Sequence, residues 1–206
     1  MHLATQIQMI RSQFPALERM DNNAPALYLD GPAGSQVPQR VVDAVSTYMT
    51  STNANSGGPF TTSVATDEMQ EQASETYAHF MGVSDPKRIV FGPNMTSLTF
   101  MMSRALATSW HEGDEIIVSQ LDHDANVSPW VIAAERAGVV VHRIRVRPED
   151  CTLDMQHFHE LLSSKTRLVA VGYASNATGT INPIAEMTKK AHSVGALIYV
   201  DAVHYA

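Results

Sequence analysis

Short apolar runs rich in β-branched residues alternate with longer, helically periodic segments between residues 88 and 200. Alternation of this kind is typical of βαβ units, in which helices cover both faces of a mainly parallel sheet. The expected strands are Arg88–Phe91, Glu115–Ser119, Val139–Ile144, Arg167–Gly172 and Ala196–Val200. The expected helices are Thr96–Thr108, Val127–Ala137, Asp154–Leu162 and Pro183–Val194. The apolar character of the strands is that of strands buried on both faces, so the sequence predicts the α/β class.

The first third of the chain is expected to be helical with loops. Val37–Thr50 and Val64–Met81 carry apolar residues at helical spacing, and the turn-rich segment Asn53–Thr62 lies between them. No internal repeat or low-complexity segment interrupts the pattern.

Composition excludes several classes of protein. The 206 residues include 14 basic and 21 acidic side chains, and the net charge of −7 disfavours binding to nucleic-acid phosphates or to an anionic membrane. A hydrophobic fraction of 44% is enough for a sizeable core. No apolar stretch is long enough to span a membrane, Met1–Pro15 lacks the apolar region of a secretory signal, and the single cysteine, Cys151, cannot form an internal disulfide. We therefore expect a soluble, cytoplasmic protein without nucleic-acid or membrane partners.

Polar side chains are concentrated in the loops that follow the expected strands. Those loops are Gly92–Ser97, Gln120–Asn126, Tyr173–Gly179 and Asp201–His204. Turns at the opposite strand ends, such as Glu112–Asp114, have the residues of plain caps. Because ligands of an open α/β sheet bind outside the carboxyl ends of its strands, this asymmetry predicts a polar small-molecule site at one edge of the sheet.

Each of these loops also has an interpretation that involves no ligand. Hydroxyls at the start of the helix after Gly92 could bind an anion, or Thr96 or Ser97 could simply cap that helix. Asp201 ends an apolar strand, where a partly desolvated carboxylate needs a cationic or proton-donating partner, or it could cap a following helix. Asn176 could donate an amide hydrogen bond to a ligand or be an ordinary turn residue.

The histidines and the cysteine are less specific signals. Asp122–Asp124 contains metal-ligand residue types, but three adjacent side chains converge poorly on one ion, so we do not expect a metal site. His123 could be a flat lid over a planar ligand or a surface residue of the loop. His157 and His159 are expected to be solvated helix residues. Cys151 lies in a turn with no cationic helix start to lower its pKa, and we expect it to be a bystander.

Taken in order, several segments resemble the pyridoxal-phosphate site of the class V aminotransferase family, in its cysteine desulfurase-like branch. The resemblance runs from about Tyr28 to Ala206. The segments that carry it are Tyr28–Gly34, Asn53–Gly58, Asn94–Ser97, Asp122–Asn126, Ser175–Thr180 and Val200–His204. It implies the large domain of a fold type I pyridoxal-phosphate enzyme over residues 28–206, without its C-terminal part and without the small domain. Residues 1–27 are expected to form an N-terminal helical segment.

The resemblance also implies roles for individual residues. Thr96 and the backbone at Met95 would anchor the cofactor phosphate, and His123 would stack on the cofactor ring and transfer protons. Asn176 would donate to the phenolic oxygen of the ring, and Asp201 would pair with the ring nitrogen. An anion beside that nitrogen keeps it protonated, which makes the ring a better electron sink.

Departures from the family pattern bear on the reaction. Typical desulfurases have Glu-His-His or Glu-His-Lys at Asp122–Asp124, and they have Gln where this chain has His204, which can still hydrogen-bond the phenolic oxygen. In this family the lysine that binds the cofactor covalently lies further along the sequence than His204. Lys165, Lys189 and Lys190 are not at the expected place. We therefore expect this chain to be the N-terminal half of a family member and to be inactive alone.

The resemblance implies a parent protein that acts on an amino acid, by desulfuration, elimination, epimerisation or transamination. We expect a homodimer, or self-association of the half-chain through exposed apolar faces. The alternative is a non-catalytic α/β protein that keeps the fold for ligand binding or assembly. A nucleotide-binding module is disfavoured, because the first expected strand and helix are not joined by Gly-x-Gly-x-x-Gly and the chain contains no Gly-Lys-Ser/Thr.

Overall fold

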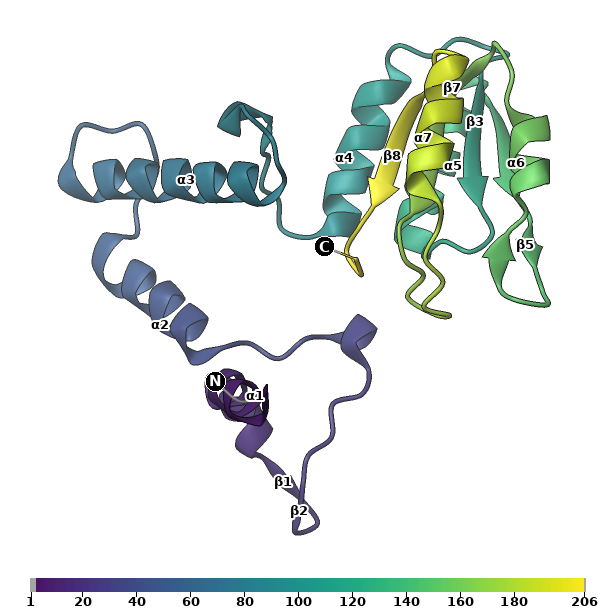
Figure 1. Cartoon of the computed structure of the whole chain (residues 1–206). Coiled ribbons are helices and arrows are strands. Elements are labelled where there is room, and N and C mark those ends of the chain that lie inside the picture. The colour runs from purple at the N-terminus through teal and green to yellow at the C-terminus, as the bar shows by residue number, and fades with distance from the viewer. Residues whose placement is uncertain (1–2, 206) are drawn as a thin grey trace. The chain divides into compact units, whose positions relative to one another are not determined.

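The computed structural model describes residues 3–205, and the chain divides into two compact units, Met1–Phe91 and Gly92–Ala206 (Figure 1). Each unit is described by itself. The domain boundary expected between residues 27 and 28 lies within the first unit and stays a prediction.

The first unit consists of helices and short turns. Its α-helices are α1 (Leu3–Arg11), α2 (Gln39–Thr47) and α3 (Thr61–Phe80). Its smaller elements are η1 (Pro15–Glu18), β1 (Met20–Asp21), β2 (Ala24–Pro25), η2 (Gly31–Ala33), the π-helical turn η3 (Tyr48–Thr52) and η4 (Pro86–Arg88). The helices expected at Val37–Thr50 and Val64–Met81 are confirmed, and each observed end lies within three residues of the expected one. The π-helical turn η3 continues the first of these helices.

The turn-rich segment between η3 and α3 is held by the first turns of α3. The Ser63 hydroxyl donates to the carbonyl of Asn55 at 2.6 Å and accepts from the Gly58 amide at 2.8 Å. The Asp67 carboxylate accepts from the amide of Gly57, whose φ is +83°. Because Gly57 adopts a conformation that favours glycine, the sequence of this loop fits its shape.

The second unit is built on a parallel sheet with strand order β4-β3-β7-β8. The strands are β3 (Glu115–Ser119), β4 (Val140–Ile144), β7 (Thr166–Gly172) and β8 (Leu197–Asp201). The helices are α4 (Met95–Ala107), α5 (Ser128–Ala137), α6 (Met155–Leu161) and α7 (Ile184–Ser193), and η5 (Asp124–Asn126) precedes α5. A small hairpin pairs β5 (Val146–Arg147) with β6 (Thr152–Leu153). The α/β class is thus confirmed.

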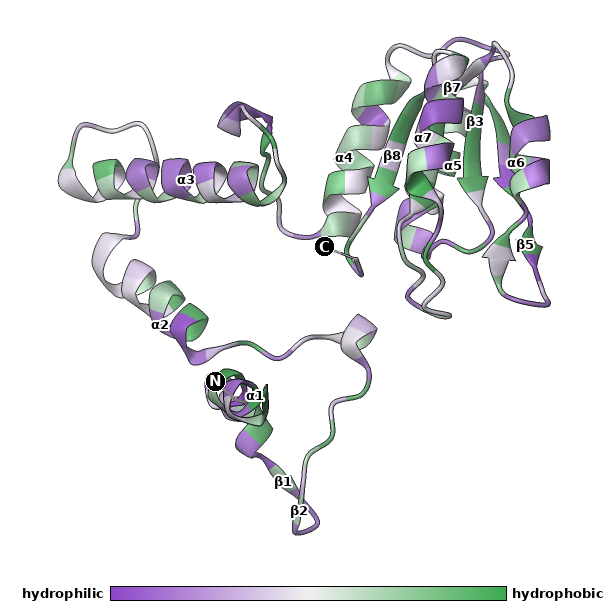
Figure 2. Cartoon of the chain, in the orientation of Figure 1, coloured by the Kyte–Doolittle hydropathy of each residue, from purple (hydrophilic) through white to green (hydrophobic). Residues whose placement is uncertain are grey.

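Helices cover both faces of this sheet (Figure 1), and the residues of its central strands alternate between two cores. Ile116 and Val118 of β3 pack with Trp130 of α5, whereas Ile117 packs with Phe158 of α6 on the opposite face. All five side chains are fully buried, and the hydropathy colouring of Figure 2 shows the apolar central strands. Burial on both faces explains why these strands read as continuous apolar runs.

The strand expected at Arg88–Phe91 is wrong. Pro86–Arg88 forms the turn η4, in which the Arg88 amide donates to the carbonyl of Asp85 and the Ile89 amide donates to the carbonyl of Pro86. These backbone groups are therefore committed to a turn, and no described strand pairs with residues 88–91. Val90 and Phe91 are 69% and 52% exposed. A strand requires a hydrogen-bonded neighbour, which an apolar sequence alone does not provide.

The strand order places a topological switch point between β3 and β7. From β3 the chain passes through α5 to β4 on one side, and it later returns to form β7 and β8 on the other side. Such a reversal opens a crevice at the carboxyl ends of the two central strands, where open α/β sheets bind ligands. The second unit thus provides a binding edge at Ser119 and Gly172.

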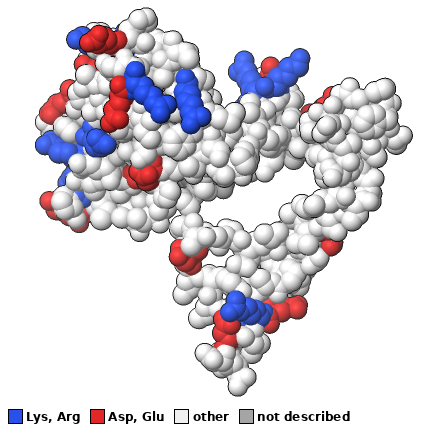
Figure 3. Space-filling view, turned by 180° about the vertical axis from the view of Figure 1, so that it is seen from behind, with Lys and Arg blue, Asp and Glu red and all other residues white. Residues whose placement is uncertain are grey.

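The surface and the helices carry few other functional signals. Acidic and basic side chains are interspersed on the face seen in Figure 3. Between residues 3 and 205, no helix combines the length and apolar character needed to cross a membrane. The same residues contain no group of three or more His, Cys, Asp or Glu side chains arranged to hold a metal ion.

Candidate functional site

Four of the six predicted site residues converge at the switch point. His123, Asn176, Asp201 and His204 line one hollow together with Gly172 at the end of β7. Each comes from a different loop or strand end at the carboxyl edge of β3, β7 or β8. The enclosed volume is only about 10 Å³, so these side chains form a polar surface patch rather than a deep cavity.

His123 is presented by the loop after β3. Its ring precedes η5, and its Nδ1 accepts a hydrogen bond from the Ala125 amide at 3.1 Å. In the neutral imidazole this bond places the proton on Nε2, because an accepting ring nitrogen carries none. The side chain is exposed, so the face of the imidazole is accessible for stacking and Nε2 is accessible for proton exchange.

Asn176 lies in a loop that is shaped by its neighbours. The Ser175 hydroxyl accepts from the amides of Ala177 and Thr178 at 3.2 and 3.3 Å, and Gly179 has φ +72°. The Asn176 side chain forms no hydrogen bond with another described residue, so its amide is available to a ligand.

Asp201 ends β8, as expected. Its backbone carbonyl accepts from the Tyr173 amide at 2.7 Å, and its Oδ1 accepts from the Val203 amide at 3.0 Å. Residues 203–205 form a turn, and the alternative that Asp201 caps a following helix stays untested. His204 is exposed in this turn beside Asp201.

Met95 and Thr96 begin α4 and do not line the hollow. The alternative that Thr96 or Ser97 caps this helix is wrong, because Asn94 is the cap and its Oδ1 accepts from the Ser97 amide at 2.8 Å. The Thr96 hydroxyl therefore remains available at the positive end of a 13-residue helix.

A partly buried hydrogen bond locates this helix relative to β8. The hydroxyls of Thr99 in α4 and Tyr199 in β8 lie 3.0 Å apart. Thr96 is one helical turn before Thr99, and Asp201 is two residues after Tyr199. The start of α4 and the end of β8 therefore lie at the same edge, as Figure 1 also shows.

A largely buried polar network that reaches the hollow at Asp122 was not foreseen from the sequence. The Ser119 hydroxyl donates to the Asp122 carboxylate, and the Asn126 amide donates to the same carboxylate at 2.8 Å. The Trp130 indole in turn donates to the Asn126 side-chain oxygen at 3.1 Å. Ser119, Asn126 and Trp130 are buried, and each has its hydrogen-bonding partner.

Burial raises the pKa of Asp122, and the charge of Asp201 adds to that rise. Hydrogen bonds from Ser119, Asn126 and the Gly172 backbone act in the opposite direction. The influence of Asp201 means that the carboxyl groups of Asp122 and Asp201 are electrostatically linked at this edge of the sheet.

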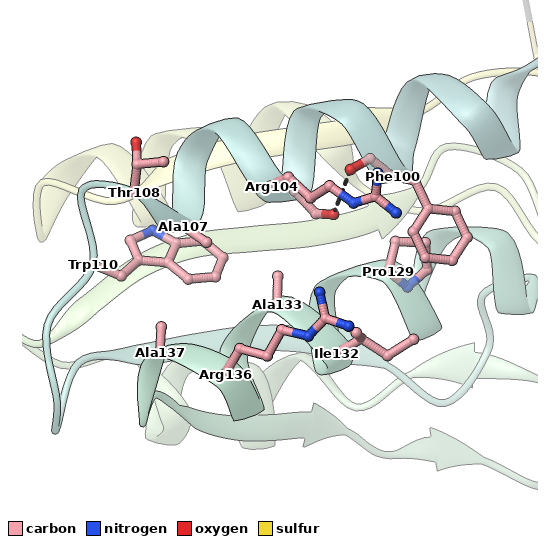
Figure 4. Close-up of a pocket in the computed structure, with 11 residues that line it drawn as sticks. Phe100, Arg104, Ala107, Thr108, Trp110, Pro129, Ile132, Ala133, Arg136 and Ala137 are labelled. Atoms are coloured by element: carbon pink, nitrogen blue, oxygen red, sulfur yellow. Dashed lines mark hydrogen bonds between the residues drawn. The ribbon is translucent and has the colours of Figure 1, made fainter.

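A more spacious groove lies elsewhere in the second unit. Figure 4 shows the groove of about 550 Å³ between α4 and α5, with Trp110 and Ile132 among its apolar residues and Arg104 and Arg136 at its sides. None of the predicted site residues lines it. The convergence of polar groups at the switch point, rather than volume, identifies the candidate site.

Comparison with known families agrees with this fold and edge. Residues 27–206 match the family model described as aminotransferase class V. The chain belongs to the class V aminotransferase family. Pyridoxal 5′-phosphate is the cofactor of this family.

Relatives of known name are cysteine desulfurases. The chain is 36% identical over 198 residues to a probable cysteine desulfurase from Vibrio cholerae, covering 95% of this chain and 48% of the relative. It is 35% identical over 203 residues to a cysteine desulfurase from Enterobacter sp. strain 638, with the same coverage of 95% and 48%. The chain thus spans about half the length of the curated relatives it matches.

Solved structures give the same result. The cysteine desulfurase CsdA from Escherichia coli aligns with a TM-score of 0.81 at 30% identity, covering 96% of this chain and 48% of that one. The apo cysteine desulfurase from Thermococcus onnurineus aligns with a TM-score of 0.86 at 26% identity and the same coverage of 96% and 48%.

Proposed function

We propose that this chain forms the cofactor-facing part of a pyridoxal-phosphate enzyme of the cysteine desulfurase type. The observation that carries the proposal is the convergence of His123, Asn176, Asp201 and His204 at the switch point of the sheet. The types of side chain fit the cofactor, since an imidazole can stack on its ring, amide and imidazole donors can meet its phenolic oxygen, and a carboxylate can meet its pyridinium nitrogen.

Each residue has a task that its surroundings support. The available carboxylate oxygen of Asp201 would hold the proton on the ring nitrogen, and Asn176 would donate to the phenolic oxygen together with His204. His123, whose Nδ1 is occupied by the Ala125 amide, would cover the ring and use Nε2 to move a proton to or from the substrate. Thr96 and the amide groups at the start of α4 would hold the phosphate, because a helix N-terminus attracts anions. The bound cofactor supplies the electron sink that labilises a bond at the α-carbon of an amino acid.

The lysines of the second unit do not belong to this edge. Lys165 immediately precedes β7, at the opposite end of that strand, and Lys189 and Lys190 lie in α7. We therefore propose that the described residues bind the cofactor through non-covalent contacts. For the whole protein we propose an amino-acid substrate, with cysteine first among the candidates because the relatives are cysteine desulfurases, and a homodimer.

Cofactor binding by the 206-residue chain tests the proposal. Pyridoxal phosphate should bind to the wild-type chain in equilibrium dialysis, and the double variant Thr96→Ala with Asp201→Ala should lose that binding, because it lacks both the phosphate anchor and the pyridinium carboxylate. The matched control is Thr108→Ala with Asp150→Ala, which changes two exposed residues of the same types in the second unit. Equal binding by the wild type and the Thr96/Asp201 variant would contradict the proposal.

The alternative function is a non-catalytic protein that keeps the fold. It predicts that the chain does not bind pyridoxal phosphate selectively. Dialysis against pyridoxine, which lacks the phosphate and the aldehyde, separates the two functions: a chain that retains both compounds equally has no cofactor site.

A further inference from the structure

Asp122 is the side chain that joins the two central strands at the candidate site. It follows β3 by three residues, and its carboxylate accepts from the hydroxyl of Ser119 and from the amide of Asn126. The Ser119 hydroxyl also accepts from the amides of Leu121 and Asp122, both at 3.1 Å. This arrangement folds the loop tightly back onto the end of β3.

The same carboxylate reaches across to β7. A Cβ atom placed on Gly172 would lie 3.1 Å from Oδ1 of Asp122, so a side chain at this position would crowd the carboxylate. Gly172 is the last residue of β7, and its Cα pairs in register with that of Asp201 on β8. Asp122 is thus packed against the strand that separates β3 from Asp201.

His123 is the next residue along the chain. Its orientation follows from the loop that Asp122 fastens, since the imidazole is otherwise held only by the bond from the Ala125 amide. The ring itself is exposed, whereas Asp122 and its partners are not. An exposed ring that must stack on a ligand needs a backbone held in one conformation. The hydrogen bonds of Asp122 hold the backbone of the adjacent residue.

We propose that Asp122 is a positioning residue for cofactor binding, which holds His123 over the site by fastening its loop to Ser119, Asn126 and the end of β7. The inference rests on the proposed function and extends it to a residue that lines the same hollow and acts through His123. At metal sites, groups that orient a ligating side chain typically change metal affinity by about 10- to 100-fold when removed, and we take the lower end for this site. Asp122→Ala should therefore weaken binding of pyridoxal phosphate about 10-fold. Asp122→Asn, which keeps the shape and can still accept from Asn126, should stay within about threefold of the wild type.

A double-mutant cycle distinguishes positioning from a general loss of stability. If Asp122 acts through His123, the variant that combines Asp122→Ala with His123→Ala should bind pyridoxal phosphate as weakly as His123→Ala alone. Asp124→Ala is the matched control, because Asp124 is an exposed carboxylate two residues away that accepts only from Ser128, at 2.6 Å. It should bind as the wild type does. Dissociation constants come from the absorbance of the bound cofactor, and the circular dichroism of that band reports whether the ring is held in one orientation.

The outcomes separate the two proposals. Wild-type binding together with unchanged binding by Asp122→Ala overturns the inference and leaves the proposed function standing. Full additivity of Asp122→Ala and His123→Ala also overturns it, because Asp122 would then act independently of the ring. If Asp122→Ala does not fold, the comparison moves to Ser119→Ala combined with His123→Ala, which removes one partner of the carboxylate and should also show non-additive loss. A wild-type chain that binds no pyridoxal phosphate overturns the proposed function, and this inference falls with it.

Discussion

Replacing Tyr199 by Phe tests whether the hydroxyl bridge between α4 and β8 holds the site edge together. The variant removes one atom, the hydroxyl oxygen that lies 3.0 Å from Oγ1 of Thr99. The contact between the Tyr199 and Trp130 rings, whose centroids are 4.9 Å apart at 66°, is retained because Phe has the same ring. The change therefore isolates the hydrogen bond from the packing.

The expected loss in the free energy of unfolding is about 1 kcal/mol. An ordinary intramolecular hydrogen bond contributes about 0.5–1.5 kcal/mol net. The larger penalty for an unsatisfied buried group does not apply, because the buried Thr99 hydroxyl keeps its bond to the Met95 carbonyl at 3.0 Å. A loss of about 1 kcal/mol corresponds to a change of about fivefold in the unfolding equilibrium constant.

Urea unfolding followed by tryptophan fluorescence measures this loss in the second unit alone, because both tryptophans, Trp110 and Trp130, belong to it. Thr99→Ala in the Tyr199→Phe background should cost less than Thr99→Ala alone, since the shared bond is already gone. Tyr28→Phe is the control: its exposed hydroxyl donates to Ala16 in the first unit, and its loss should leave the tryptophan transition unchanged. A loss below about 0.3 kcal/mol for Tyr199→Phe, or full additivity with Thr99→Ala, would refute the reasoning.

Three further outcomes are expected from the same assay. Gly172→Ala should cost about 1–3 kcal/mol, because its Cβ would lie 3.1 Å from Oδ1 of Asp122, whose carboxylate is held by one hydrogen bond to each oxygen; a neutral result would mean that the loop moves freely. The pKa of Asp114 is held below its usual value by the His111 amide and by Arg167, so its stabilisation is present above the ordinary carboxyl range and is lost as pH falls through the lowered pKa. Asp114→Asn should therefore reduce the loss of stability on acidification, and an unchanged pH profile would show that the carboxylate contributes nothing. Burial raises the pKa of Asp122, so its ionisation costs stability. Asp122→Asn should therefore gain in stability relative to the wild type as pH rises from the ordinary carboxyl range through the raised pKa. A constant difference in stability across that range would contradict the raised pKa of Asp122.

Most of the second unit could be predicted from sequence because its strands are buried on both faces. Glu115–Ser119 is predicted and observed with the same ends, and the helix before Gly138 ends where expected, with Gly138 in the left-handed region at φ +68°. The same rule failed at Arg88–Phe91, where an apolar run has no strand to pair with in the described residues. Apolar periodicity reports what a segment buries, whereas pairing depends on a neighbour elsewhere in the chain.

The candidate site was predictable to the extent that it depends on strand ends. His123, Asn176, Asp201 and His204 were found by reading the residues after each strand, and the structure brings them to one hollow. Asp122 was considered as a metal ligand and as a departure from the family pattern, and no role in holding the loop was assigned to it. The spacing of Asp122, Asn126 and Trp130 at intervals of four residues is a signal that could have indicated a polar column along one side of a helical segment.

The buried side chains behind the edge matter as much to this site as the motif residues in front of it. Thr96 is three residues before Thr99, His123 follows Asp122, and Asp201 is two residues after Tyr199. Thr99 and Tyr199 bond to each other, Tyr199 packs on Trp130, and Trp130 connects through Asn126 to Asp122. One continuous set of contacts therefore sets the relative positions of the helix start, the imidazole and the carboxylate. Because a rigid ligand needs these groups at fixed separations, a substitution inside this set should alter cofactor affinity. A substitution in the opposite core, such as one at the fully buried Met187, should alter stability alone.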